Sequence, residues 1–259
     1  DVMYVYDPAG VEPQRAHELA LKLVAELRRH AEDHRLPLEL DAGLRPEGRN
    51  GPLARSIDAY AAYYRRWSLS WEAQALLRAR GIAGSTSLIA RFTELADEIR
   101  YPAEVDQQGI REIKRIKARV ENERLPQGAD RSRHLKLGPG TLSDVEWLVQ
   151  ITQLQHAHAV PEMRTTSTLE ALDAAVAADI IPDDAAERLT EAWRLASRLR
   201  SAHTLLSGQT SDILPADRQQ LDGIGRILEY PPRSATQVEE DYLGATRRAR
   251  RAFETLFYG

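Results

Sequence analysis

The chain has 259 residues, 42% of them hydrophobic, with 35 basic against 39 acidic side chains and a net charge of −4. The hydrophobic content excludes an intrinsically disordered chain, and the negative charge argues against a general nucleic-acid-binding protein. The chain has no Cys, which excludes disulfides and thiolate metal sites and fits a cytoplasmic protein, while no apolar run approaches the ~18 residues that indicate a membrane span.

The first 53 residues predict two strands, one helix and a loop. Residues 2–6 (VMYVY) are short, β-branched and aromatic, which is typical of a buried strand. Apolar residues recur at helical spacing over 13–31. The alternation of Leu with polar residues over 36–40 predicts a second strand with one apolar face. Residues 42–53 (AGLRPEGRNGPL) are rich in Gly and Pro and predict a loop.

The rest of the chain is helical in pattern. Ser143, with Glu146 three residues later, is typical of the start of a helix. We therefore expect an α+β fold that is mostly α, with a small α/β domain over residues 1–100 and a helical bundle over 101–259. The helices are expected over roughly 56–67, 70–80, 87–100, 104–123, 143–159, 167–178, 183–206, 216–229 and 235–258.

Two acids stand at the ends of the expected strands. Asp1 lies at the start of the first strand and Asp41 directly after the second. If both strands belong to one sheet, the two carboxylates can converge at one edge. Carboxylate oxygens are the ligands that Mg²⁺ prefers in proteins, so the pair is a candidate metal site. The alternative is two unrelated surface acids.

The loop after Asp41 carries two guanidinium groups four residues apart, on Arg45 and Arg49. Gly48 and Gly51 allow the backbone to approach a ligand closely. Because Arg binds phosphate through two parallel hydrogen bonds, this loop is a candidate clamp for a nucleotide triphosphate. The alternative is a solvated loop that leads into the next helix.

Two basic segments follow in the helical part. The helix over 104–123 and its end carry basic side chains that we interpret as a solvated face (Arg111, Lys114, Arg115, Lys117, Arg119 and Arg124). Lys136 precedes a Gly-rich turn that opens a helix, where an anion can bind at the helix N-terminus. Asp144, in the first turn of that helix, is equally typical of a plain capping residue.

Three segments together resemble one family. They are residues 38–53 (LELDAGLRPEGRNGPL), 71–80 (WEAQALLRAR) and 136–150 (KLGPGTLSDVEWLVQ). In order and spacing they resemble the bacterial glutamine synthetase adenylyltransferases, and the likeness covers essentially the whole chain. Residues 110–150 also resemble the start of the helical domain of PII-uridylyltransferases.

The resemblance implies a partial nucleotidyltransferase fold of the polymerase-β type, followed by a helical bundle. The family's active site has a Gly-Ser turn, an Asp-x-Asp pair and a third acid. Asp1 matches the second acid of the pair and Asp41 the third, so the Gly-Ser turn and the first acid are expected before Asp1. Asp1 and Asp41 are then catalytic and hold Mg²⁺. Arg45, Arg49 and Lys136 are expected to contact the phosphates of ATP.

The function implied by this resemblance is transfer of AMP from ATP to a Tyr of glutamine synthetase, in the C-terminal half of a multifunctional enzyme of nitrogen regulation. Expected partners are glutamine synthetase, a PII-type signal protein and ATP, with no nucleic acid and no membrane. Residues 1–259 alone are expected to be inactive. Two alternatives are the half that removes AMP by phosphorolysis, and a non-catalytic helical module that docks glutamine synthetase or a PII-type protein.

Overall fold

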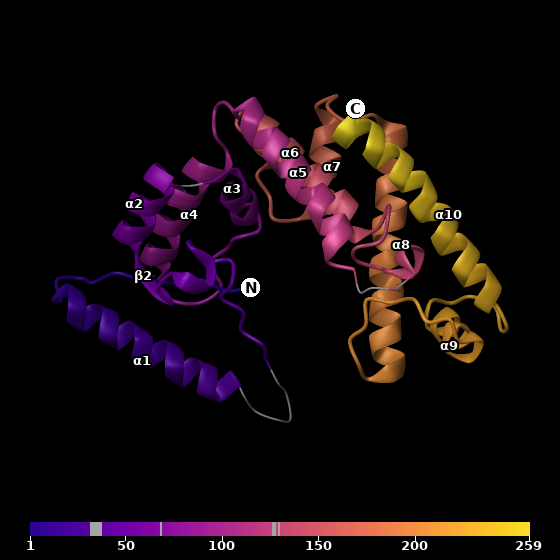
Figure 1. The fold of residues 1–259 in the computed structure, drawn as a ribbon, viewed down its shortest axis with the longest axis horizontal. Coiled ribbons are helices and arrows are strands. Elements are labelled where there is room, and N and C mark those ends of the chain that lie inside the picture. Colours follow the sequence, from indigo (N-terminus) through magenta and orange to yellow (C-terminus); the bar gives the residue numbers. More distant parts are fainter. Residues whose placement is uncertain (32–37, 68, 126–127, 129) are drawn as a thin grey trace. The chain divides into compact units, whose positions relative to one another are not determined.

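The structure is a computed structural model that describes residues 1–31, 38–67, 69–125, 128 and 130–259. It forms two compact units, Asp1–Pro102 and Ala103–Gly259. Helices dominate both units, and the strands that the structure describes lie in the first (Figure 1). The predicted fold class, α+β and mostly α, is confirmed.

The first unit is built on a two-stranded parallel sheet. Strand β1 (Tyr4–Tyr6) pairs with β2 (Ala54–Ser56), with Tyr4 opposite Ala54. Helix α1 (Pro13–Ala31) joins them and buries Ala20 and Val24 in a cluster with Ala54. The helix over 13–31 is therefore confirmed, whereas the strand expected over 2–6 is shorter and only half-buried, because it covers Tyr4–Tyr6 alone.

The expected strand over 36–40 is wrong for the residues that the structure describes. Leu36 lies outside them, and residues 38–40 form no strand. Leu38 is 62% exposed, and its N–H donates to the carbonyl of Ala31 at 3.1 Å. The partner of β1 is instead β2, which follows the predicted loop over 42–53 and ends at Ser56, where a helix was expected to begin. A segment in which apolar and polar residues alternate forms a strand only when a neighbouring strand pairs with its backbone N–H and C=O groups.

Three helices complete the first unit: α2 (Ile57–Trp67), α3 (Ser70–Leu76) and α4 (Thr86–Arg100). Tyr60 and Tyr64 of α2 pack with Phe92 of α4 in its core. The expected helix over 70–80 ends early, at Leu76. Buried Arg100 donates to the carbonyls of Leu76 and Ala79 at 2.9 and 2.7 Å, and so satisfies the end of α3.

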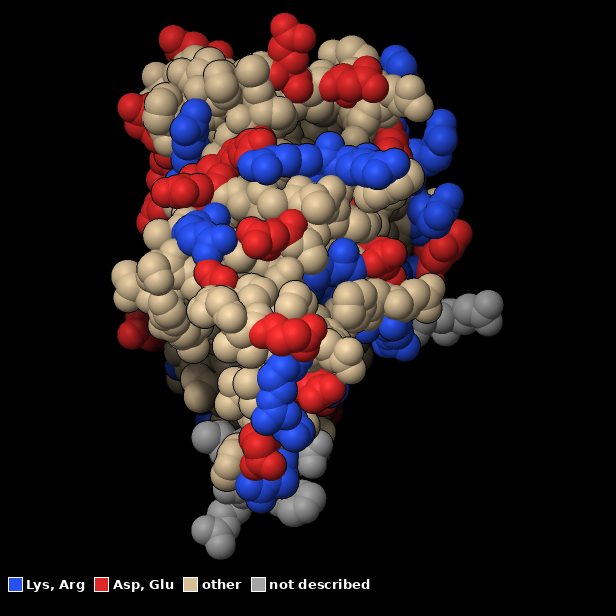
Figure 2. Space-filling model, turned by 90° about the vertical axis from the view of Figure 1, so that its left-hand side faces the viewer, with Lys and Arg blue, Asp and Glu red and all other residues tan. Residues whose placement is uncertain are grey.

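The face of the molecule that Figure 2 shows mixes basic and acidic side chains, with no large area of one sign among its described residues. Ion pairs across α2 and α4 contribute to this mixture, such as Arg65 with Glu98 at 2.9 Å and Arg91 with Asp58 at 3.4 Å. A polyanion binds to a continuous basic stripe, and the mixed charges of this face do not provide one.

The second unit is a helical bundle. Its longest helix, α8 (Asp183–Ser207), packs against α10 (Ala235–Phe253), and a short π-helical turn, Glu254–Tyr258, follows α10. The other helices are α5 (Gln107–Glu123), α6 (Leu142–His156), α7 (Thr168–Ala177) and α9 (Arg218–Ile227).

Helix α6 begins one residue before the expected cap. Its first residue is Leu142 and its N-cap is Thr141, so the predicted capping pair of Ser143 and Glu146 is wrong. The Ser143 N–H donates to the carbonyl of Lys136 at 2.9 Å, which makes Ser143 part of the first helical turn. In the described part of the chain, no helix is long and apolar enough to cross a membrane.

Candidate functional site

Asp1 and Asp41 lie next to each other although they are 40 positions apart in the chain. The N–H of Val2 donates to the carbonyl of Asp41 at 2.6 Å, and both acidic residues are exposed. The backbone therefore joins the chain next to Asp1 to that of Asp41 without the strand that was expected to carry Asp41.

The carboxylate of Asp41 is oriented by the loop that follows it. Its Oδ1 accepts the N–H of Gly43 at 2.7 Å. A Cβ on residue 43 would stand 3.0 Å from this oxygen, closer than carbon usually approaches, so Gly43 permits the contact. One carboxylate oxygen is thus held in place by the backbone in a position open to solvent.

The residues present fit magnesium in kind but make an incomplete site. Asp1 and Asp41 offer hard oxygen donors in contact with water, and Mg²⁺ usually combines one or two carboxylates with several waters. Among the described residues, no group of three or more Asp, Glu, His or Cys side chains gathers as a metal site. The assignment of Asp1 and Asp41 to metal stays a prediction.

The structure separates the two arginines of the predicted clamp. The Arg45 guanidinium turns inward and donates to the carbonyls of Ala42, Arg49 and Gly51 at 2.6 to 3.1 Å. The Arg49 side chain is exposed, and no hydrogen bond or ion pair ties it to another described residue. Of the two, Arg49 is the one whose charge is free for an anion.

Lys136 is exposed, in the second unit, just before the turn that leads to α6. The start of this helix already holds an anion of the protein's own, because the carboxylate of Asp144 accepts the N–H of Gly140 at 2.6 Å. Asp144 therefore acts as a capping residue at the start of α6, which is one of the two roles that its position predicted. Contact of Lys136 with phosphate stays a prediction.

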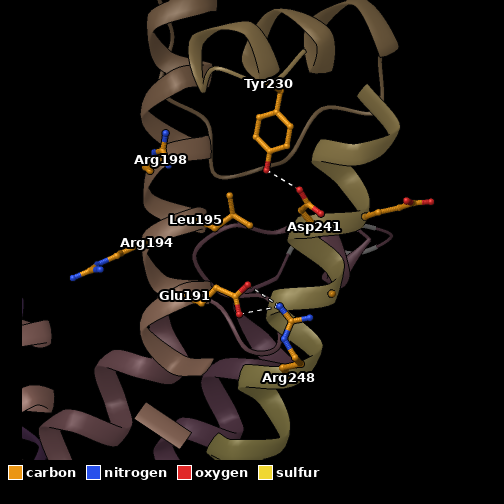
Figure 3. Close-up of a pocket in the computed structure, with 9 residues that line it drawn as sticks. Glu191, Arg194, Leu195, Arg198, Tyr230, Asp241 and Arg248 are labelled. Atoms are coloured by element: carbon orange, nitrogen blue, oxygen red, sulfur yellow. Dashed lines mark hydrogen bonds and ion pairs between the residues drawn. The ribbon is translucent and has the colours of Figure 1, made fainter. Parts of the chain in front are cut away.

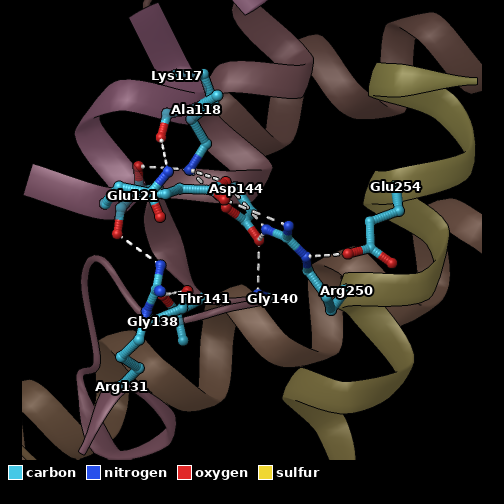
Figure 4. Close-up of polar contacts among 12 residues, drawn as sticks. Lys117, Ala118, Glu121, Arg131, Gly138, Gly140, Thr141, Asp144, Arg250 and Glu254 are labelled. Atoms are coloured by element: carbon cyan, nitrogen blue, oxygen red, sulfur yellow. Dashed lines mark hydrogen bonds and ion pairs between the residues drawn. The ribbon is translucent and has the colours of Figure 1, made fainter. Parts of the chain in front are cut away.

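Asp144 is also the centre of a buried charge network that the sequence analysis missed (Figure 4). Lys117 from α5 meets it at 2.6 Å and Arg250 from α10 at 2.9 Å, while Asp144 is only 1% exposed. Glu121 joins both cations, at 3.1 and 3.0 Å. The network connects α5, α6 and α10, so we interpret it as structural.

Lys117 does not lie on a solvated face, as its basic neighbours suggested. Its side chain is 1% exposed, and its Nζ lies 5.4 Å from the centre of the Phe253 ring. The signal that could have shown this is its spacing, since Lys117 follows the buried Ile110 and Ile113 at helical intervals. Burial of an ammonium group requires partners, and Asp144 and Glu121 supply them.

A buried His lies at the base of the Lys136 loop. The Nδ1 of His134 accepts the N–H groups of Lys136 and Leu137 at 3.3 and 3.0 Å. Burial lowers the pKa of His134, against the opposing charge of Asp212. The neutral ring therefore organises this loop, and a proton on Nδ1 would remove both acceptor contacts.

This arrangement predicts a loss of stability on mild acidification. Because the folded protein has the lower His134 pKa, the unfolded chain takes up a proton first as the pH falls below its ordinary value of 6.5. The free energy of unfolding from this group should stay constant above that pH and fall below it by up to about 1.4 kcal/mol per pH unit. Urea titrations from pH 7.5 to 5 should show a smaller loss for His134→Gln. Parallel pH profiles for both proteins would contradict the assignment.

A cavity of about 530 Å³ opens between α8 and α10 in the second unit (Figure 3). Its polar walls are largely matched in charge: Glu191 bonds Arg248 at 2.7 and 2.8 Å, and the Tyr230 hydroxyl donates to Asp241 at 3.0 Å. None of the residues predicted for the site lines it. The candidate site therefore remains the surface around Asp1, Asp41 and Arg49.

Both units of the chain match models of known protein families. Residues 1–95 match the family model of glutamate-ammonia ligase adenylyltransferase, and residues 112–257, more than half of the chain, match that of PII-uridylyltransferase. The bifunctional glutamine synthetase adenylyltransferase/adenylyl-removing enzyme of Leifsonia xyli is 60% identical over the whole chain. The chain belongs to the glutamine synthetase adenylyltransferase family.

Other members of the glutamine synthetase adenylyltransferase family are similar over the same length. Those of Streptomyces avermitilis and Mycobacterium leprae are 49% and 47% identical over 100% and 99% of the chain. In each of these relatives, as in that of Leifsonia xyli, the match covers 26% of the longer protein. The chain thus spans about a quarter of the length of the curated relatives that it matches.

Proposed function

We propose that this chain carries part of an active site that transfers AMP from ATP to a Tyr of glutamine synthetase. Its support is the backbone hydrogen bond from Val2 to Asp41, which joins the chain next to Asp1 to that of Asp41, with both acidic residues exposed. The names of the relatives point to the same chemistry.

In this reaction the tyrosyl oxygen bonds to the α-phosphorus of ATP, the bond from that phosphorus to the bridging oxygen breaks, and pyrophosphate leaves with the electron pair. Asp1 and Asp41 would hold magnesium, which neutralises the phosphate charge when bound. Asp41, with one oxygen held by Gly43, is also placed to accept the proton of the hydroxyl. Arg49 would contact the phosphates, and Lys136 is a further candidate for this contact.

The finer assignments belong to the same proposal. We place the chain in the cytoplasm, where its lack of Cys is ordinary, and we expect a PII-type signal protein to regulate it. The relatives are named as bifunctional enzymes that also remove adenylyl groups. The alternative activity is therefore removal of AMP by phosphate, with release of ADP. A helical module that only docks glutamine synthetase is the non-catalytic alternative.

The test uses the full-length product of the gene that encodes residues 1–259. Incubation with labelled ATP and glutamine synthetase should transfer label to a Tyr and release pyrophosphate. Incubation of the adenylylated product with phosphate distinguishes the removing activity, because ADP then appears. Binding of glutamine synthetase with neither reaction would favour the docking module and contradict the proposal.

Residues 1–259 alone are expected to show little transfer. They supply the carboxylates of Asp1 and Asp41, two of the ligands proposed for the metal. The loss of a group that merely supports a metal ligand already lowers activity by about 10- to 100-fold. We expect activity at least about 100-fold below that of the full-length protein. Circular dichroism controls for folding, and robust transfer by the folded 259-residue chain would contradict the metal assignment.

A further inference from the structure

We propose that Arg45 is a positioning residue: it closes the loop over residues 41–51, orients Asp41 and Arg49, and does not contact the nucleotide. The proposal rests on the proposed function, and it reverses the role that the sequence suggested for Arg45. It follows from the contacts of the guanidinium, because every one of them is to the backbone of this loop.

The donors of Arg45 are almost fully used within the loop. A guanidinium has five N–H groups in a rigid fork. The Nε of Arg45 donates to the Gly51 carbonyl at 3.1 Å, Nη1 to that of Ala42 at 2.6 Å, and Nη2 to those of Arg49 and Gly51 at 3.1 and 3.0 Å. Four contacts leave one N–H, too few for the two parallel bonds by which Arg grips a phosphate.

These contacts join the two ends of the loop. Ala42 follows Asp41 directly, whereas Gly51 lies nine positions farther along the chain, and the same guanidinium holds both carbonyls. The Gly43 N–H that orients the Asp41 carboxylate lies one residue beyond Ala42. Movement of the Ala42 carbonyl would therefore shift the carboxylate as well.

The backbone around Arg45 has little freedom to close in another way. Glu47 and Gly48 both adopt positive φ, at 64° and 56°. A Cβ on residue 51 would stand 2.2 Å from the Pro46 carbonyl oxygen, so only Gly fits there. Glu47 also pairs with Arg55, which ties the loop to β2. The loop thus has a specific shape, and the guanidinium of Arg45 lies at its centre.

Arg49 provides the matched comparison, because it lies in the same loop with the same charge. Its carbonyl accepts from Arg45 Nη2 at 3.1 Å, which fixes its backbone, while its side chain extends into solvent. One Arg therefore acts on the protein and the other is free to act on an anion. Kinetics can distinguish the two roles.

The experiment compares Arg45 and Arg49 variants of the full-length protein in the transfer assay. Arg45→Ala should lower kcat by about 100-fold, because a small displacement of a catalytic group is that harmful, with KM for ATP nearly unchanged. Arg45→Lys should not restore kcat, since an ammonium lacks the fork that reaches three carbonyls. Arg49→Ala should instead raise KM for ATP by about 10- to 150-fold, and Arg49→Lys should recover part of it.

A second measurement does not depend on activity. Hydrogen exchange of the full-length protein, followed by mass spectrometry of the peptide over 42–53, reports on the loop's hydrogen-bonded amides, among them those of Gly48 and Gly51. Arg45→Ala should speed their exchange by at least about 10-fold, and Arg49→Ala should leave it unchanged.

The outcomes separate the two proposals. If the unsubstituted protein transfers no AMP, the proposed function fails, while the exchange data still decide whether Arg45 organises the loop. If Arg45→Ala raises KM for ATP, keeps kcat and is rescued by Lys, Arg45 contacts the nucleotide and the inference is wrong. Unchanged exchange in Arg45→Ala would overturn it as well.

Discussion

Asp41→Asn in the full-length protein should abolish AMP transfer while the protein stays as stable as before. The substitution keeps the size of the side chain, and an amide oxygen can still accept the Gly43 N–H that Asp41 accepts at 2.7 Å. A neutral amide is a poor ligand for Mg²⁺ and no base, so both proposed roles of the carboxylate fail together. We expect a loss of at least about 1,000-fold in turnover, because a catalytic base alone contributes about 10²–10⁴-fold and the loss of the metal ligand adds to that.

The measurement is paired, with thermal unfolding in the absence of metal and turnover in the presence of Mg²⁺ and ATP. Asp58→Asn is the matched control, because this acid in the same unit is 82% exposed and its contact with Arg91 is long, at 3.4 Å. The control should keep full activity. A folded Asp41→Asn protein that adenylylates glutamine synthetase at the parent rate would contradict the assignment of Asp41 to the active site.

Asp144→Ala should destabilise the second unit more than any surface substitution. It leaves Lys117, which is 1% exposed, and Arg250 without their shared carboxylate, and it leaves the Gly140 N–H without its acceptor. Removal of one partner of a buried ion pair costs about 3–5 kcal/mol, and we expect the lower end of this range because Glu121 still contacts both cations. Chemical denaturation of the wild-type and variant proteins measures this difference directly.

Two variants show whether the effect comes from the buried network. Glu191→Ala removes a partner of Arg248 from an exposed pair and should cost less than about 1 kcal/mol. Lys117→Met combined with Asp144→Ala should cost clearly less than the sum of the single changes, because the double variant no longer buries a Lys that has lost its closest carboxylate. Additive losses, or a cost for Asp144→Ala no larger than that of Glu191→Ala, would contradict the network.

Local patterns predicted most of the secondary structure. The helix over 13–31 forms with the expected bounds, because its hydrogen bonds lie within the segment itself. The strand expected over 2–6 forms only over Tyr4–Tyr6 and is half-buried. The strand over 36–40 was wrong for its described part, and β2 was missed. Both errors concern sheet pairing, which depends on a partner distant in the chain and not on the pattern of the segment itself.

In the candidate site, too, some features could be predicted from the sequence and others depended on contacts made after folding. The resemblance to the family indicated that Asp1, Asp41 and the Arg-containing loop act together, and the hydrogen bond from Val2 to Asp41 joins the backbone at these two places. Which Arg serves the loop and which remains free could not be predicted, because Arg45 and Arg49 have the same charge and lie in one turn-rich segment. The direction of a side chain follows from the carbonyls that surround it after folding.

The sequence by itself determined the family and the mostly helical class, because these depend on residue identity, order and periodicity, and it supplied the residues that we propose for the site. Only the tertiary structure decided that Lys117 is buried against Asp144 and that Arg45 holds a loop together. Both depend on the free energy of placing a charge among distant groups. A buried charge is stable only where folding supplies its partners, and no local pattern records where those partners will be.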